Sequence, residues 1–135
     1  VVTNTVNVAL ELCRREGIAV FVTGGYLRGG WFSMVGPAAV HALGEIYADK
    51  VFIGVNGIHP ARGLTANHPD EASTNRAMIR QARTKIVVAD HTKLGKVASA
   101  KICPTEEVDI LITDTGAGDA AVAPLRKMGI DVRRV

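Results

Sequence analysis

The segments KVFIGV at residues 50–55 and KIVVA at residues 85–89 decide the fold, because each is a short and almost continuous apolar run. Such runs, without alternating polar residues, are typical of strands that are buried on both faces of a parallel sheet. Residues 70–83 between them are predicted to form a helix, with Asp70 as its cap and Glu71 in the acidic first turn that a helix dipole favours. A strand, a helix and a second strand in this order predict a βαβ crossover.

The same alternation extends in both directions along the chain. Further strands are predicted at residues 1–3, 18–23, 109–113 and 130–135, further helices at 4–16, 36–47 and 119–128, and a glycine- and proline-containing loop at 56–69. The sequence therefore predicts an α/β fold with three layers and a mostly parallel sheet with βαβ crossovers. Residues 1–135 are expected to form one domain, since 135 residues suffice for one compact core.

Composition and charge exclude several classes of protein. Hydrophobic residues make up 47% and charged residues 21%, as in an ordinary globular domain, and no apolar run approaches the roughly 20 residues that span a bilayer. Cys13 and Cys103 are far apart, and two lone cysteines predict reduced thiols and a cytoplasmic location. The net charge of +3 arises from basic residues that are spread along the chain, which predicts a solvated surface rather than a DNA-binding face.

Small polar, glycine and charged residues follow the predicted strands, and ligands bind at the carboxyl ends of the strands in open parallel sheets. In chain order these residues are Asn4, Gly24, Gly25, Arg28, Gly57, Asp90 and Lys93. Glycines allow backbone N–H groups to approach an anion, Lys93 and Arg28 can neutralise a phosphate, and Asp90 can accept hydrogen bonds from sugar hydroxyls. Each residue alone fits an ordinary turn equally well, but their agreement on one edge favours a ligand site.

Two other kinds of site are weighed against this interpretation. The histidines at 59, 68 and 91 lack the HxH or HxxxH spacing of a metal site, so neither a metal nor a cofactor is predicted. The segment DTGAGD at 114–119 resembles the glycine-rich anion-hole motif of ribokinase-like sugar kinases. Nothing that resembles the nucleotide site of those kinases follows it, so a strand-to-helix turn with Asp119 as N-cap is the preferred interpretation.

Six stretches, in order and spacing, carry a resemblance to another family. They are VVTNT at 1–5, TGGYLRGGWFSMVGPAA at 23–39, ADKVFIGVNGIHPARGLT at 48–65, EASTNRAMIRQA at 71–82, VVADHTKLGK at 87–96 and DILITD at 109–114. Together they resemble the C-terminal effector-binding (sensor) domain of DeoR-family transcriptional regulators, whose fold is related to ribose-phosphate isomerase, glucosamine-phosphate deaminase and CoA-transferase. The resemblance covers essentially the whole chain.

The resemblance implies a bacterial repressor domain that binds a phosphorylated sugar and controls DNA binding by an N-terminal winged helix-turn-helix. It places in the effector pocket Asn4, Gly24, Gly25, Gly57, Asp90 and Lys93, with Glu71 and Arg76 nearby. Arg76 follows Asn75, a position where many members have Lys, so the basic group is displaced by one residue.

The family's domains begin with an earlier strand and a glycine-threonine-threonine loop that helps to hold the phosphate. The chain is therefore expected to be an N-terminally truncated sensor domain without the DNA-binding domain, and the full-length protein is expected to form a homo-oligomer. A sugar-phosphate isomerase- or deaminase-like enzyme is the alternative function. Sensing is favoured over catalysis because the resemblance is to the regulators.

Overall fold

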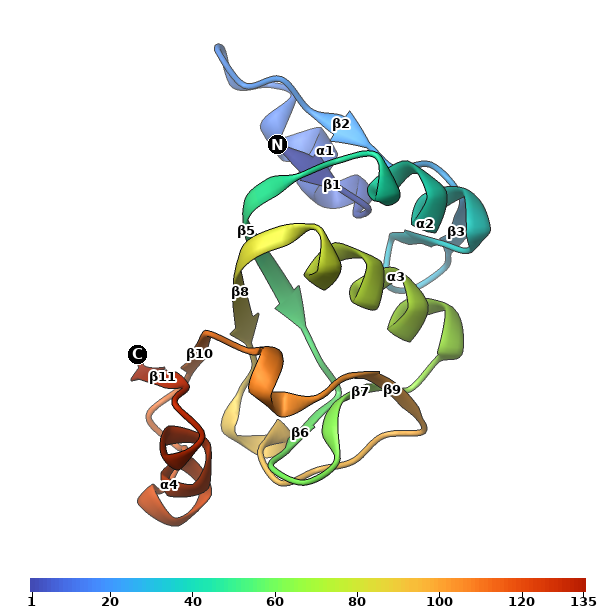
Figure 1. Cartoon of the computed structure of the whole chain (residues 1–135). Coiled ribbons are helices and arrows are strands. Elements are labelled where there is room, and N and C mark those ends of the chain that lie inside the picture. The colour runs from blue at the N-terminus through green and yellow to red at the C-terminus, as the bar shows by residue number, and fades with distance from the viewer. The chain divides into compact units, whose positions relative to one another are not determined.

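A computed structural model describes all of the chain, residues Val1–Val135. The chain divides into two compact units, Val1–Ile46 and Tyr47–Val135. Each unit has its own sheets, and Figure 1 labels most of their strands and helices.

The unit Val1–Ile46 combines one pair of parallel strands with a hairpin and two helices. Its elements are β1 (Val2–Thr3), α1 (Val6–Leu12), β2 (Phe21–Val22), β3 (Tyr26–Arg28), β4 (Ser33–Val35) and α2 (Pro37–Gly44). Strands β1 and β2 are parallel, and β3 and β4 are antiparallel. Helix α2 lies within the predicted range 36–47 and begins with Pro37, because the fixed φ of proline suits the first turn of a helix.

Two predictions for this unit are wrong in part. The helix expected over residues 4–16 ends at Leu12, and it has neither a side-chain cap nor a buried residue that would stabilise further turns. The expected strand at residues 18–23 is reduced to β2. The β3–β4 hairpin was not predicted, although the pair Gly29 and Gly30 between two short apolar runs is a recognised hairpin signal.

The unit Tyr47–Val135 contains a parallel sheet, a smaller antiparallel sheet and the helices that connect their strands. Its elements are β5 (Ala48–Gly54), β6 (Gly57–His59), β7 (Gly63–Ala66), α3 (Pro69–Arg80), β8 (Ala82–Val88), the 3-10 helix η1 (His91–Lys93), β9 (Ala100–Cys103), the 3-10 helix η2 (Thr105–Glu107), β10 (Ile110–Thr113), α4 (Asp119–Lys127) and β11 (Asp131–Arg134).

The main sheet has the order β11-β10-β8-β5, and all of its pairings are parallel. The connection from β5 to β8 contains β6, β7 and helix α3, and helix α4 connects β10 to β11. The predicted fold class, α/β with a mostly parallel sheet and helical crossovers, is confirmed. Since the strands are parallel, their carboxyl ends lie at one edge of the sheet, from which η1 and the loop to α4 emerge.

Two helix caps differ from the prediction. His68, not Asp70, is the N-cap of α3, and its ring nitrogen Nδ1 accepts a hydrogen bond from the backbone N–H of Asp70. Gly118, not Asp119, is the N-cap of α4, and the Asp119 carboxylate instead accepts a hydrogen bond from Arg134. The strand-to-helix turn expected at 114–119 does connect β10 to α4.

The loop expected at residues 56–69 contains the strands β6 and β7, so that prediction is wrong. These strands join β9 in an antiparallel sheet of order β6-β7-β9. The pairing partner β9 lies more than thirty residues further along the chain, as the register Leu64 with Cys103 shows. A local hydrophobic pattern cannot reveal such a pairing. Both strands also begin with a glycine, which is typical of loops, so the sequence did not indicate the strands themselves.

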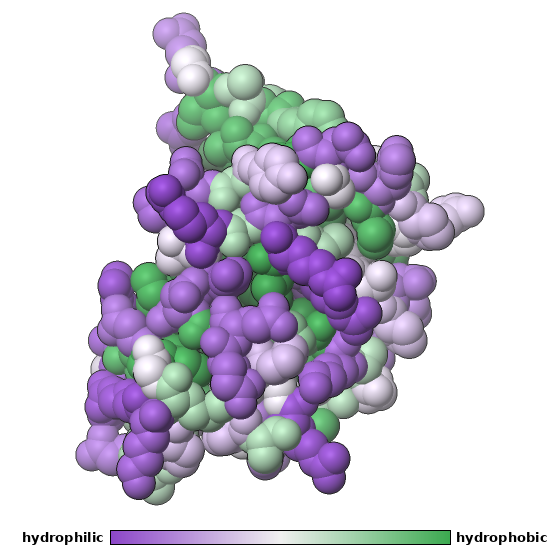
Figure 2. All heavy atoms as spheres, in the orientation of Figure 1, coloured by the Kyte–Doolittle hydropathy of each residue, from purple (hydrophilic) through white to green (hydrophobic).

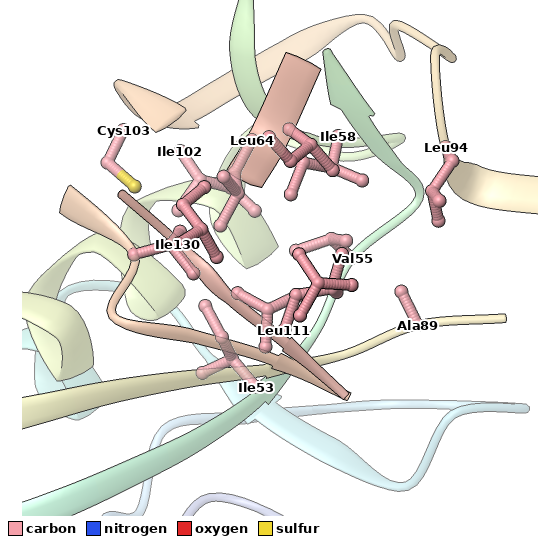
Figure 3. Close-up of a cluster of buried hydrophobic side chains, with 14 of the residues drawn as sticks. Ile53, Val55, Ile58, Leu64, Ala89, Leu94, Ile102, Cys103, Leu111 and Ile130 are labelled. Carbon is pink, nitrogen blue, oxygen red and sulfur yellow. The ribbon is translucent and has the colours of Figure 1, made fainter. Parts of the chain in front are cut away.

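One hydrophobic core joins the two sheets and both helices of this unit. Leu64 of β7, Ile102 of β9 and Leu111 of β10 are at most 1% exposed, and Figure 3 shows these side chains gathered in the same cluster. Ile79 of α3 and Leu125 of α4 belong to the same core. Buried leucines and isoleucines of this kind each stabilise a fold by about 2–5 kcal/mol relative to alanine.

Burial of the main sheet is not the same at every strand position. Phe52 on β5 and Val88 on β8 are 62% and 47% exposed, so the expectation that each strand is buried on both faces is wrong here. Figure 2 shows hydrophobic atoms that reach the surface in several places among polar and charged ones. No helix of the structure has the length and apolar character needed to cross a membrane.

Candidate functional site

The predicted site residues fall into two groups, one in each unit. Those in Val1–Ile46 are Asn4, Gly24, Gly25 and Arg28, and those in Tyr47–Val135 are Gly57, Glu71, Arg76, Asp90 and Lys93.

Residues 90–93, here called the strand-end turn, leave the carboxyl end of β8 and form η1. Oδ1 of Asp90 accepts hydrogen bonds from the backbone N–H of Thr92, at 2.9 Å, and from the Thr92 hydroxyl. The ammonium Nζ of Lys93 lies 3.8 Å from Oδ2 of Asp90. The turn therefore holds a carboxylate and an ammonium group side by side at the edge where open parallel sheets bind ligands.

The protonation state of Asp90 follows from the same contacts. The hydrogen bond from the Thr92 hydroxyl lowers the pKa of the Asp90 carboxyl, and the nearby charge of Lys93 acts in the same direction. Asp90 is exposed, so solvent screens these interactions. The carboxylate is ionised at neutral pH and can only accept hydrogen bonds.

A second carboxylate, that of Asp114, fastens the strand-end turn to the end of the neighbouring strand β10. Its Oδ2 accepts the backbone N–H of His91 at 2.7 Å, and its Oδ1 lies 2.8 Å from Nδ1 of the His91 ring. Oδ1 also accepts the backbone N–H of Gly116 at 2.8 Å. These contacts, the hydrogen bond from the His91 backbone foremost, lower the pKa of Asp114 to about 2.

Gly57 lies at the start of β6, where a neighbouring segment of the same chain approaches closely. A Cβ atom on Gly57 would lie 2.5 Å from the carbonyl oxygen of Lys96 and 2.8 Å from Oγ1 of Thr65. The close approach that suggested an anion at this glycine is therefore made by the chain's own backbone. Gly57 remains a predicted ligand contact, and its role in packing is independent of that prediction.

Arg76, in the middle of α3, uses its guanidinium group to hold β9. Nε donates to the carbonyl of Ile102 at 2.8 Å, and a terminal nitrogen donates to the carbonyl of Lys101 at 2.5 Å. Arg76 also lines a cavity of about 290 Å³ together with Arg80 and Lys101, but no residue of the strand-end turn lines this cavity. Glu71 lies in the first turn of the same helix, as predicted.

In the unit Val1–Ile46, Asn4 and Gly25 lie beside the hairpin strand β4. The side-chain amide of Asn4 donates to the carbonyl of Met34 at 3.0 Å. Gly24 and Gly25 follow β2 with φ values of 69° and 107°, and a Cβ on Gly25 would lie 2.5 Å from the carbonyl oxygen of Val35. Arg28 is half-buried at the end of β3.

The structure thus places Asp90 and Lys93 close together and adds residues that are not among the predicted ligand contacts. His91, Asp114 and Gly116 complete the edge formed by β8 and β10. Their signal in the sequence was positional: His91 and Asp114 each follow a strand, and the two strands are neighbours. No group of three His, Cys, Asp or Glu side chains is placed to hold a metal ion.

Comparison with known proteins identifies the family to which the chain belongs. Residues 1–115 match the family described as the DeoR C terminal sensor domain. The chain belongs to this family, and the relatives that it matches are named as transcriptional repressors and regulators.

Individual relatives show how much of a regulator the chain represents. It is 37% identical over 130 residues to a protein named putative aga operon transcriptional repressor from Escherichia coli O157:H7, covering 96% of this chain and 48% of that protein. It is 34% identical over 132 residues to the HTH-type transcriptional repressor GlcR of Bacillus subtilis, covering 98% and 51%. It is also 31% identical over 114 residues to the glycerol-3-phosphate regulon repressor of Escherichia coli K12, covering 84% and 45%. The chain spans about half the length of the relatives it matches.

Proposed function

We propose that this chain is the effector-binding part of a bacterial transcription repressor and that its effector is a phosphorylated sugar. The observation that carries the proposal is the strand-end turn, which presents the Lys93 ammonium and the Asp90 carboxylate 3.8 Å apart. An ammonium group neutralises a phosphate, and an ionised carboxylate accepts hydrogen bonds from hydroxyls. A phosphorylated sugar offers both groups on one small molecule.

The remaining predicted contacts are part of the same proposal. They are Asn4, Gly24, Gly25, Arg28, Gly57, Glu71 and Arg76. Among them, the Asn4 amide donates to the carbonyl of Met34, and the Arg76 guanidinium donates to carbonyls of β9. Alanine variants of these two residues therefore report on local stability as well as on binding, and both must be measured.

Control of DNA binding follows from the repressor family. We propose that the sugar phosphate favours one arrangement of the full-length protein over another, and so changes the affinity of a winged helix-turn-helix for its operator. The relative named for the glycerol-3-phosphate regulon supports an effector that carries a phosphate. Such a regulator acts in the cytoplasm, where the DNA is, and as a homo-oligomer that binds repeated operator sites.

Thermal unfolding of the full-length protein tests the proposal. Ribose 5-phosphate, glucosamine 6-phosphate, glucose 6-phosphate and glycerol 3-phosphate are added at millimolar concentration, and Tm is measured. A compound present at about 100 times its Kd stabilises the folded state by about 2.7 kcal/mol. If none of the four raises Tm, the proposal is wrong.

Two matched lysine variants locate the binding. Lys93→Ala should abolish the rise in Tm while the unliganded Tm changes little, because Lys93 is only partly buried and its ion pair is solvent-screened. Lys127→Ala removes an exposed lysine at the end of α4 and should leave the rise intact. An undiminished rise with Lys93→Ala would exclude this lysine from the site.

Sensing without turnover is also part of the proposal, in place of isomerase- or deaminase-like catalysis. Each of the four compounds is incubated with the full-length protein in deuterated water and followed by proton NMR. We expect no exchange of carbon-bound hydrogen and no product. Exchange that depends on the protein would show catalysis.

A further inference from the structure

His91 is a polar side chain at the strand-end turn to which the proposed function gives no role. It lies between Asp90 and Lys93 in sequence, and its side chain is 50% exposed. Its backbone N–H and its ring are both bound by the Asp114 carboxylate, at 2.7 Å and 2.8 Å. One carboxylate thus holds both the backbone of this residue and Nδ1 of its ring, whereas the ring of an ordinary surface histidine is free to rotate.

The partner determines which ring nitrogen carries hydrogen. The backbone hydrogen bonds from His91 and Gly116 hold the pKa of Asp114 at about 2, so the group is a carboxylate at neutral pH. A carboxylate can only accept hydrogen bonds, and the hydrogen therefore lies on Nδ1 of His91. In the neutral ring, Nε2 is left with a lone pair that has no hydrogen of its own.

Gly116, two residues after Asp114 in the same turn, leaves space for this contact. A Cβ atom on Gly116 would lie 2.6 Å from Nδ1 of His91 and 2.7 Å from Oδ1 of Asp114. Any side chain at this position would push the ring and the carboxylate apart. The glycine at position 116 is therefore independent evidence that the turn after β10 accommodates the pairing of His91 with Asp114.

We propose that His91 is a further, specificity-determining contact for the phosphorylated sugar, with Nε2 accepting a hydrogen bond from a sugar hydroxyl while Asp114 orients the ring. This inference rests on the proposed function and assigns different groups of the ligand to different side chains of the strand-end turn. Lys93 binds the phosphate, and His91 and Asp90 accept hydroxyl groups of the sugar. Because the ring is held before the ligand arrives, binding loses little of its side-chain entropy.

Binding measurements on the full-length protein separate the hydroxyl contact from the phosphate contact. Isothermal titration is carried out with ribose 5-phosphate, glucosamine 6-phosphate, glucose 6-phosphate and inorganic phosphate. His91→Ala should weaken binding of the sugar phosphate by about tenfold, which is the typical effect of one lost neutral hydrogen bond, and should leave binding of inorganic phosphate unchanged. Lys93→Ala should weaken both.

A pair of amide variants distinguishes the two ring nitrogens. His91→Gln places an acceptor near the position of Nε2 and should restore part of the lost affinity. His91→Asn places a polar group near Nδ1, where it can reach only Asp114, and should not restore it. His41→Ala, which removes an exposed histidine of α2, should leave the affinity unchanged.

The orienting role of Asp114 has a spectroscopic test that needs no ligand. In the unmodified protein, the nitrogen-15 shifts of His91 should show a single neutral tautomer with hydrogen on Nδ1. Asp114→Asn should give a mixture of both tautomers and a weaker affinity for the sugar phosphate. A single tautomer of the opposite kind in the unmodified protein would overturn the assignment.

The remaining outcomes separate this inference from the proposed function. If the unmodified protein binds a sugar phosphate and His91→Ala binds it equally well, the inference is overturned and the proposed function stands. Equal losses for sugar phosphate and inorganic phosphate would overturn the hydroxyl contact. An unmodified protein that binds none of the three sugar phosphates, and whose Tm glycerol 3-phosphate does not raise either, would overturn both proposals.

Discussion

The guanidinium of Arg76 donates from Nε to the carbonyl oxygen of Ile102 over 2.8 Å and thereby fastens helix α3 to strand β9. A second nitrogen of the same group binds the carbonyl of Lys101. Ile102 is almost fully buried, so this strand belongs to the core that Figure 3 shows. The guanidinium of Arg76 thus stabilises the packing of α3 against β9, independently of any contact with a ligand.

Replacing Arg76 by Met should therefore destabilise the fold. The variant keeps most of the aliphatic side chain and loses two charge-assisted hydrogen bonds, each worth roughly 1.5–3 kcal/mol. Water can hydrogen-bond to the exposed carbonyl of Lys101 in the variant and so offsets part of this loss. We expect the free energy of unfolding in urea to fall by about 1–3 kcal/mol. Arg80→Met on the same helix is the control, since Arg80 is exposed, and it should change that free energy by at most about 0.5 kcal/mol.

Gly57→Ala should be destabilising because the added Cβ would lie 2.5 Å from the carbonyl oxygen of Lys96. The obstacle is backbone and cannot rotate away, so the segment around Lys96 must shift. Overpacking of this kind costs about 1–3 kcal/mol of unfolding free energy. Gly54→Ala is the matched control: a Cβ there would meet nothing within 4 Å, and the variant should be neutral or slightly stabilising. Equal losses in both variants would contradict the close approach at Gly57.

The parallel sheet could be predicted from sequence because its signal is local. The apolar runs at 50–55 and 85–89 and the helix between them correspond to β5, β8 and α3, with shifts of a few residues at their ends. Hydrophobic periodicity and the residues that start and end helices form patterns over a few neighbouring positions. They can therefore be recognised in a single sequence. The antiparallel sheet had no such signal, since its central strand β7 pairs with β9 across the whole of α3 and β8.

The candidate site was predictable to the same extent and for the same reason. Asp90 and Lys93 were found because both follow a recognisable strand, and their proximity is local to one turn. The pairing of His91 with Asp114 required knowledge that β8 and β10 are neighbours, which depends on the order of strands in the sheet. The contacts of Arg76 could not be predicted, because its hydrogen bonds to β9 depend on tertiary packing that no local pattern contains.

Thr113→Val should leave the protein at least as stable as before. The Thr113 hydroxyl is buried at the end of β10 and has no hydrogen-bond partner, so the folded state bears the cost of its desolvation. Valine has nearly the same shape and suits a strand, and the gain should lie between zero and about 3 kcal/mol. Thr105→Val is the contrast, because the buried Thr105 hydroxyl donates to the carbonyl of His59 at 2.9 Å, and this variant should be destabilised by about 1–3 kcal/mol. A loss of stability in Thr113→Val would show that its hydroxyl has a partner.

Acid should weaken the fold partly through Asp114. Its pKa is about 2 in the folded protein, whereas an aspartate in an unfolded chain has a pKa of about 3.9. A group whose pKa is lower in the folded state stabilises that state fully above the unfolded pKa, and this contribution is lost as the pH falls through the folded pKa. The contribution of Asp114 should therefore be complete above about pH 4 and disappear progressively toward pH 2.

Asp114→Asn isolates this contribution. We expect the variant to be less stable than the unmodified protein at pH 7, and the difference between them to shrink as the pH is lowered from about 4 to about 2. Some acid sensitivity should persist in the variant, because the pKa of Asp90 is lowered by the Thr92 hydroxyl and that of Asp119 by Arg134. Urea unfolding of both proteins at several pH values measures the two curves. If the curves run parallel through this range, the carboxylate of Asp114 does not hold His91 in the way the structure shows.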